Sequence, residues 1–169
     1  FSTMFHMTND SHLFRTREEL EMEGFELEGN HLVRSDEVFL PIYEGRMIHH
    51  FDHRVASVGI NDENLFRSGV SLETSQDDHS NPIFQVMPRY WVNSADVQES
   101  IPKGYIRKWF MGFKDVTSPT NERTMIISLF PYSAVGNKIP LIVTMKEASV
   151  VCRLLANLSS LVLDFAARQ

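Results

Sequence analysis

The densest group of chemically versatile side chains in the sequence is the stretch His49–Arg54. Its possible metal ligands are His49, His50, Asp52 and His53. Imidazole and carboxylate groups bind zinc, and His79 or Asp77 could complete such a site. Strand alternation would divide the group, with the outer histidines on one face and the middle histidine and the aspartate on the other. A metal-dependent nuclease is therefore one alternative function, and hydrogen bonding to DNA phosphates or base edges is another use of these side chains.

The stretch Asn81–Phe84 contains a superficial likeness to the Asn-Pro-Pro-aromatic motif of amino-methyltransferases. The second proline is missing, and no glycine-rich loop for a methyl donor precedes it. The chain also lacks a nucleophile elbow, a phosphate loop, a paired-cysteine zinc pattern and a dinucleotide fingerprint. We therefore expect no catalysis and no bound cofactor in this chain by itself.

Basic and aromatic residues are interleaved in Pro88–Trp91 and again in Arg107–Lys114. The aromatic rings of such strands usually pack into a core. Lys108 and Lys114 would then project from the opposite face, toward DNA phosphates. The loop Thr120–Arg123 has two interpretations that remain open, turn capping with an Arg–Glu pair or contact with DNA. The net charge of −6 opposes phosphate binding, although an acidic chain can still present a basic face.

The elements that position these residues begin with a capping box at Thr16–Glu19, which predicts a helix over Arg17–Glu23. A turn at Gly29-Asn30 predicts a hairpin over residues 25–33. Val38–Tyr43 is β-prone, and its Pro41 favours a sheet edge or a bulge.

The middle of the chain predicts strands separated by connectors. Met47–Val58 alternates like one long strand. Gly59–Asn81 is polar and predicts a long surface loop. The connector Asn93–Gly104 can hold one helical turn. Nearly continuous apolar character predicts a central buried strand over Thr124–Phe130. Further strands are expected over Ile83–Val92, Tyr105–Val116 and Leu141–Thr144.

The C-terminal segment predicts one long helix, opened by a capping box at Thr144–Glu147. Apolar residues recur at steps of three and four, as in a helix that faces the core. They are Val151, Leu154, Leu155, Leu158, Val162 and Phe165. Cys152 lies within this stripe, which favours a packed core thiol over a reactive one.

Length and composition fit one mixed α+β domain with a mainly antiparallel sheet and few helices. We divide the 169 residues into a helical and hairpin part (1–36), a sheet-rich core (37–144) and the C-terminal helix (145–169). The start at Phe1 and the end inside a helical pattern predict an excised fragment of a larger enzyme. The sequence contains no secretory signal and no long apolar run, and has a single cysteine, so we expect a cytoplasmic protein without a membrane partner.

Several stretches in order resemble the region after the catalytic domain of large adenine-specific DNA methyltransferases. This family includes fused restriction–modification enzymes and BREX-type phage-defence methyltransferases. The similar blocks are Leu40–Ile48 with Phe51–Arg54, Pro88–Val92, Trp109–Asp115, Thr120–Thr124 with Pro131, and Leu158–Ser160 with Asp164-Phe165 and Arg168-Gln169. The last block departs from the family's Leu-Asn-Ser, because Ser159 stands where the asparagine is expected.

The resemblance implies a parent that methylates adenine at N6, with S-adenosylmethionine bound in a domain upstream of Phe1. It also implies that this region helps to choose the DNA sequence, through a fold akin to the recognition domains of Type I specificity subunits. The expected partners are double-stranded DNA and the remainder of the parent enzyme. Our candidate DNA contacts are Arg46, His50, Arg54, Lys114, Asn121 and Arg123. The alternative is a structural or partner-docking segment of the same enzyme.

Overall fold

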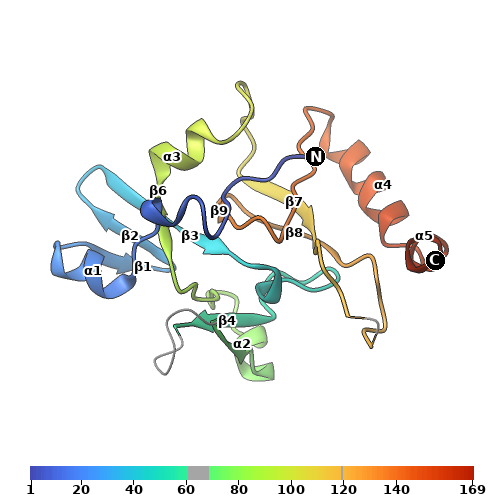
Figure 1. Ribbon diagram of the computed structural model, residues 1–169, viewed down its shortest axis with the longest axis horizontal. Coiled ribbons are helices and arrows are strands. Elements are labelled where there is room, and N and C mark those ends of the chain that lie inside the picture. The colour runs from blue at the N-terminus through green and yellow to red at the C-terminus, as the bar shows by residue number, and fades with distance from the viewer. Residues whose placement is uncertain (61–68, 119) are drawn as a thin grey trace.

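The computed structural model describes residues 1–60, 69–118 and 120–169 as a mixed α+β fold with mostly antiparallel sheets (Figure 1). The helical elements are η1 (Ser11–Leu13), α1 (Arg17–Met22), η2 (Gly45–Met47), α2 (Gln76–Ser80), α3 (Ser94–Glu99), α4 (Ala148–Leu158) and α5 (Leu161–Arg168). The strands are β1 (Glu26–Glu28), β2 (His31–Arg34), β3 (Glu37–Tyr43), β4 (Ala56–Gly59), β5 (Val70–Glu73), β6 (Trp91–Asn93), β7 (Trp109–Phe113), β8 (Ile127–Pro131) and β9 (Ala134–Val135). The predicted fold class is confirmed.

The main sheet has the order β1-β2-β3-β6, and β9 adds to β3 in parallel. Pro41 lies in β3 between β2 and β6, so the predicted edge position is wrong. Two features make this proline tolerable. The paired part of β2 ends opposite Phe39, and Trp91 directs its backbone N–H and carbonyl to Arg15 rather than to Pro41. The missing N–H of the proline therefore leaves no ladder bond unmade.

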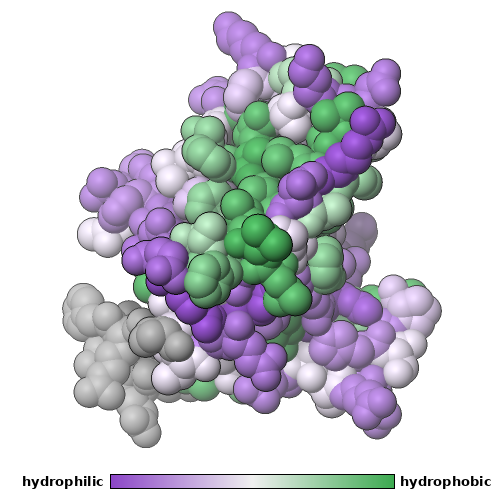
Figure 2. Space-filling model, turned by 90° about the vertical axis from the view of Figure 1, so that its right-hand side faces the viewer, coloured by the Kyte–Doolittle hydropathy of each residue, from purple (hydrophilic) through white to green (hydrophobic). Residues whose placement is uncertain are grey.

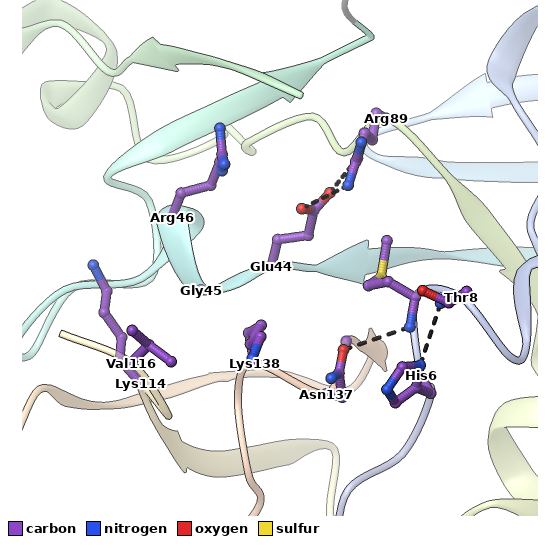
Figure 3. A pocket seen from close by; sticks show the side chains of 12 residues that line it. His6, Thr8, Glu44, Gly45, Arg46, Arg89, Lys114, Val116, Asn137 and Lys138 are labelled. Atoms are coloured by element: carbon purple, nitrogen blue, oxygen red, sulfur yellow. Dashed lines mark hydrogen bonds and ion pairs between the residues drawn. The ribbon is translucent and has the colours of Figure 1, made fainter. Parts of the chain in front are cut away.

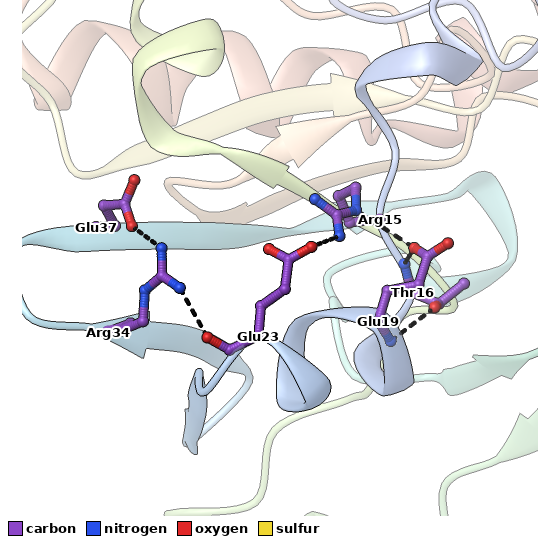
Figure 4. Close-up of polar contacts among 6 residues, drawn as sticks. All are labelled: Arg15, Thr16, Glu19, Glu23, Arg34 and Glu37. Atoms are coloured by element: carbon purple, nitrogen blue, oxygen red, sulfur yellow. Dashed lines mark hydrogen bonds and ion pairs between the residues drawn. The ribbon is translucent and has the colours of Figure 1, made fainter.

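The local structure around α1 agrees with the predictions made from the sequence (Figure 4). Thr16 accepts from the Glu19 backbone N–H while the Glu19 carboxylate accepts from that of Thr16, which is the predicted capping box. Arg15 bridges Glu19 and Glu23, and Gly24 follows with φ +86°. The predicted hairpin is present as β1 and β2, turned at Gly29.

The predicted long strand over Met47–Val58 is wrong, because only β4 forms within it. His49 and Asp52 exchange backbone hydrogen bonds across a tight turn, with N–O distances of 2.6 and 3.0 Å. Phe51 adopts φ +60° in that turn, and the Asp52 carboxylate accepts from the Arg54 backbone N–H at 2.7 Å. Side-chain alternation alone did not reveal this local competition for backbone groups.

The predicted loop over Gly59–Asn81 contains two elements. β5 pairs antiparallel with β4, and α2 begins at a capping box made by Ser75 and Asp78. Part of that prediction, residues 61–68, lies outside the described residues.

The strand predicted over Thr124–Phe130 forms over Ile127–Pro131 as β8. Its predicted central position is wrong, because among the described residues β8 pairs with β7 alone. This strand is buried because both of its faces are packed. Ile127 packs with Val151 of α4, and Phe130 packs with Phe110 in the largest hydrophobic cluster. Of the other expected strands, Ile83–Val92 contributes only the start of β6, and Leu141–Thr144 only isolated bridges at Leu141. The helical turn expected between Asn93 and Gly104 is confirmed as α3.

The C-terminal helix is divided into α4 and α5, which are bent by 56°. Thr144 bonds to the Lys146 N–H, and α4 begins without a side-chain cap, so the predicted capping box is wrong. The Ser160 side chain accepts a hydrogen bond from the Leu163 N–H. It thereby caps the start of α5 just after α4 ends.

The predicted core stripe on these helices is confirmed only in part, with Leu155 and Leu158 partly buried against the core. Val151 packs against β7 and β8, whereas Val162 and Phe165 are 80% and 69% exposed. Figure 2 shows a broad apolar area on the face of the molecule where α4 and α5 lie. Cys152 is exposed, which corrects the expectation of a core thiol.

No single helix within the described residues has the length and apolar character needed to cross a membrane. The bent pair of α4 and α5 meets that test jointly, by length and composition only.

Candidate functional site

A cleft of about 760 Å³ opens beside the end of β3 and gathers four basic side chains (Figure 3). We call it the basic cleft and define it by Arg46, Arg89, Lys114 and Lys138. Glu44 is the one carboxylate among its described lining residues.

The four basic residues of the basic cleft come from four distant parts of the chain. β3 leads directly into η2, which carries Arg46. Lys114 follows β7 and is held by a backbone hydrogen bond from its N–H to the Ile126 carbonyl, at 2.9 Å. Lys138 follows β9, and its carbonyl accepts from the Asp115 N–H at 3.0 Å. The cleft therefore depends on the pairing of the whole sheet region and not on one local motif.

Glu44 and Arg89 form a two-pronged ion pair in the basic cleft, with N–O distances of 2.7 and 3.1 Å. Their side chains are only 12% and 13% exposed. This geometry satisfies the carboxylate with a planar guanidinium. Glu44 is thereby neutralised locally, and the other three cations set the charge of the cleft.

Those three cations differ in how firmly they are held. Arg46 donates to the carbonyl of Gly69 and, at 3.3 Å, to the hydroxyl of Ser71. Lys138 lies 3.5 Å from Asp115 in an exposed pair, which water and salt weaken.

Lys114 is half-buried and has no acidic partner among the residues that the structure describes. Burial lowers the pKa of its ammonium group. An arriving anion would supply the missing opposite charge and favour the ammonium form. The arrangement suits a phosphate or a similar oxyanion.

The structure brings Arg46 and Lys114 of the predicted DNA contacts into this one cleft. Arg54 lies elsewhere and holds the segment after α2: it donates to the carbonyls of His79, Asn81 and Phe84 at 3.1–3.3 Å. These carbonyls occupy both of its terminal amino groups.

The remaining predicted contacts surround the junction of α4 and α5. Arg123 donates to the Ser159 carbonyl, and its Nε lies 3.6 Å from Asp164. The backbone carbonyl of Asn121 accepts from Arg168 at 2.8 Å. The Nδ1 atom of His50 is enclosed without a hydrogen-bond partner among the described residues. The Thr120–Arg123 loop thus anchors α5, which favours the structural interpretation of Arg123.

The histidine-rich stretch does not assemble a metal site among residues 1–60, 69–118 and 120–169. Asp52 instead contacts His79, with Oδ2 and Nε2 3.0 Å apart, and its other oxygen accepts from the Arg54 N–H. The Nδ1 atom of His79 contacts the Ser75 carbonyl at 3.1 Å. Both ring nitrogens of His79 are occupied, so the pair braces α2 and offers no open base.

Sequence reasoning did not select Glu44, Arg89 or Lys138. Arg89 lies in the basic and aromatic stretch Pro88–Trp91, which was a usable signal. Lys138 is an isolated lysine in a loop, and only the parallel pairing of β9 with β3 brings it to the cleft.

Comparison with protein-family models, with curated proteins and with solved structures found no match to this chain.

Proposed function

We propose that this chain is a DNA target-recognition module of an adenine-specific DNA methyltransferase or restriction–modification enzyme, without chemistry of its own. Its basic cleft would hold phosphates of the DNA backbone. The methyltransferase parent, its S-adenosylmethionine and its phage-defence role rest on the sequence resemblance over Leu40–Gln169. Phosphate binding rests on the convergence of four basic side chains in one cleft.

That convergence matters because the chain as a whole has a net charge of −6. Acidic residues outnumber basic ones, yet four basic side chains from segments far apart in the sequence meet in this cleft. Phosphate contacts fix the position of a protein on the duplex, whereas contacts with base edges select the sequence. The basic cleft would perform the first task, and bases would be read by side chains around it or by the parent enzyme.

The test is duplex binding measured by fluorescence anisotropy, between about 50 and 200 mM salt. Lys138→Ala should weaken binding and reduce the slope of log affinity against log salt by about 1, the value for one lost phosphate contact. Lys103→Ala is the matched control, because it removes the same charge from an exposed position outside the cleft. Equal effects of the two variants, or none from either, would contradict the proposal.

The alternative, a structural or partner-docking segment that contacts the remainder of the same enzyme, is favoured by one observation. Leu161, Val162 and Phe165 on α5 are 69–80% exposed, an unusual amount of apolar surface for one short helix. This alternative predicts no salt-dependent DNA binding by the chain. The anisotropy measurement therefore separates the two functions.

A further inference from the structure

A second cavity, of about 590 Å³, is also lined by a residue at the end of β3. We call it the aromatic pocket and define it by His31, Tyr43, His53, Phe84, Lys108 and Tyr132. It shares no described lining residue with the basic cleft, although Tyr43 and Glu44 are neighbours in the chain. Its volume lies in the range of pockets that hold small molecules.

Tyr43 supplies the observation that points to a ligand. Its side chain is 2% exposed, and its ring stacks on Phe130 with centroids 5.3 Å apart. The hydroxyl makes no hydrogen bond with any described residue, yet it is not among the fully enclosed orphan atoms of the structure. A buried phenol normally has a partner. Because Tyr43 lines the aromatic pocket, its hydroxyl is available to bond to an occupant.

Arg54 also lines the pocket, where its terminal amino groups donate to the carbonyls of His79, Asn81 and Phe84. Apart from Arg54 and Lys108, the other polar groups of the pocket are uncharged. Burial raises the pKa of the Tyr43 phenol above its ordinary range, so it is a neutral donor. Burial also lowers the pKa of His31 and of His53, which favours neutral imidazoles with one donor and one acceptor each. Asn30, 6% exposed, also lines the pocket, and uses its amide N–H to bond to the Val86 carbonyl at 3.2 Å. No carboxylate belongs to the part of the lining that the structure describes.

Flat apolar surface and an exposed cation complete the pocket. Phe84 and Tyr132 are half-buried, and the ring of Tyr132 is fixed by stacking on Phe110 at 5.2 Å. Lys108 is exposed at the rim, with its ammonium 5.9 Å from the Tyr132 ring. These groups would fit a ligand with a flat ring, hydrogen-bonding groups at the edge of that ring, and an attached negatively charged group near Lys108.

From this combination we infer that the aromatic pocket binds a nucleobase, with the attached phosphate near Lys108. Aromatic side chains stack on bases of any identity, and neutral imidazole, phenol and amide groups can pair with base edges. A plain phenyl ring would leave the Tyr43 hydroxyl unpaired, which binding sites of this kind penalise. The base could belong to a free nucleotide or to an unpaired strand. The inference does not depend on the basic cleft.

The test is calorimetric titration of the 169-residue chain with deoxynucleoside monophosphates, with ribose 5-phosphate and phenyl phosphate as comparisons. At least one nucleotide should bind about tenfold more tightly than ribose 5-phosphate, because stacking of the base supplies a factor of that order. Saturation-transfer NMR should show magnetisation reaching the base protons. Equal affinity for phenyl phosphate, or no nucleotide binding, overturns the inference.

Variants locate the binding. Tyr43→Phe keeps the stacked ring and should weaken the nucleotide about fivefold, as expected for one hydrogen bond. Lys108→Ala, at the exposed rim, should weaken the nucleotide about threefold and leave the nucleoside unchanged. Lys103→Ala, which removes the same charge from an exposed position outside both the basic cleft and the aromatic pocket, is the matched control and should change neither. Nucleotide binding that responds to Lys138→Ala but not to the two pocket variants would assign it to the basic cleft and refute the pocket.

The source of the base is decided by comparing a mononucleotide with a short unstructured oligonucleotide. Tighter binding of the oligonucleotide, still sensitive to Tyr43→Phe, assigns the pocket to an unpaired strand. Tighter binding of the mononucleotide assigns it to a free nucleotide.

Discussion

Lys114 combines two properties that usually oppose each other in a binding residue. It is half-buried without an acidic partner among the described residues, so its charge costs folding energy, and it lines the basic cleft, where that charge would attract an anion. Binding groups held in unfavourable surroundings trade stability for function. Nothing in the local sequence reveals this, because the burial of Lys114 arises only in the folded chain.

We expect Lys114→Met to stabilise the chain at neutral pH and to weaken duplex binding. Because burial lowers the folded-state pKa, the unfolded chain binds the proton more tightly. The stability of the wild type should therefore rise with pH between that lowered pKa and the unfolded value of about 10.4. Urea unfolding at several pH values measures this. Unchanged stability in the Lys114→Met variant, with the same alkaline rise as in the wild type, contradicts the assignment.

Local hydrogen bonding explains which elements could be predicted. The capping box at Thr16–Glu19 and the turn at Gly29 use neighbouring residues only, and both formed as expected. Some failures have local causes, such as the tight turn of His49 and Asp52, and others involve competition from distant groups. Met125 and Thr124 give their N–H groups to Asp164 at 2.7 Å, so β8 begins later than the apolar run suggests. The apolar stripe of the C-terminal segment also predicted more burial than the structure shows. Periodicity identifies an apolar helix face, but not which part of the protein covers that face.

Asp164 is the polar anchor of α5, and its carboxylate should make that helix sensitive to acid. Hydrogen bonds from the backbone N–H groups of Met125 and Thr124, with the charges of Arg123 and Arg168, lower the pKa of this carboxyl. The resulting stability is present above the unfolded value of about 3.9 and is lost as pH falls through the lowered pKa. Amide exchange of Leu161–Arg168 should therefore accelerate in acid before that of β7.

The matched variant for this anchor is Asp164→Asn, which keeps the shape and removes the charge. It should accelerate exchange in α5 at neutral pH and flatten the acid response. Protection of α5 that is identical in the wild type and the variant at neutral pH would show that apolar packing alone holds the helix.

At the scale of the whole molecule, Gly112 marks the tightest approach between the β7–β8 pair and the segment that returns from β9. A Cβ at this position would lie 2.6 Å from Ile139 and 3.1 Å from the Pro140 carbonyl. Gly112→Ala should cost about 1–3 kcal/mol through overpacking. Gly45→Ala is the control, because its Cβ would meet only ordinary contacts, the nearest at 3.5 Å. Thermal unfolding checks both, and equal midpoints would contradict the expectation.

The candidate site could be predicted only in part, because it is formed by segments that lie far apart in the sequence. Arg46 and Lys114 were selected as single basic residues, but the cleft that joins them to Arg89 and Lys138 is a product of long-range pairing. The aromatic pocket was not foreseen, since its defining residues come from β2, β3 and four separate loops.

The central place of β3 also has a consequence for the kinetics of folding. In chain order, the partners of this strand are its neighbour β2, then β6, and then β9, which starts at residue 134. Closing such long loops costs chain entropy before any stabilising contact forms. Folding should therefore be slow compared with that of a domain dominated by local contacts. The β1–β3 meander contains only local pairings, whereas both cavities need later segments, with Lys138 in the basic cleft and Tyr132 in the aromatic pocket. An early folding intermediate would therefore be ordered around α1 and still lack both binding sites.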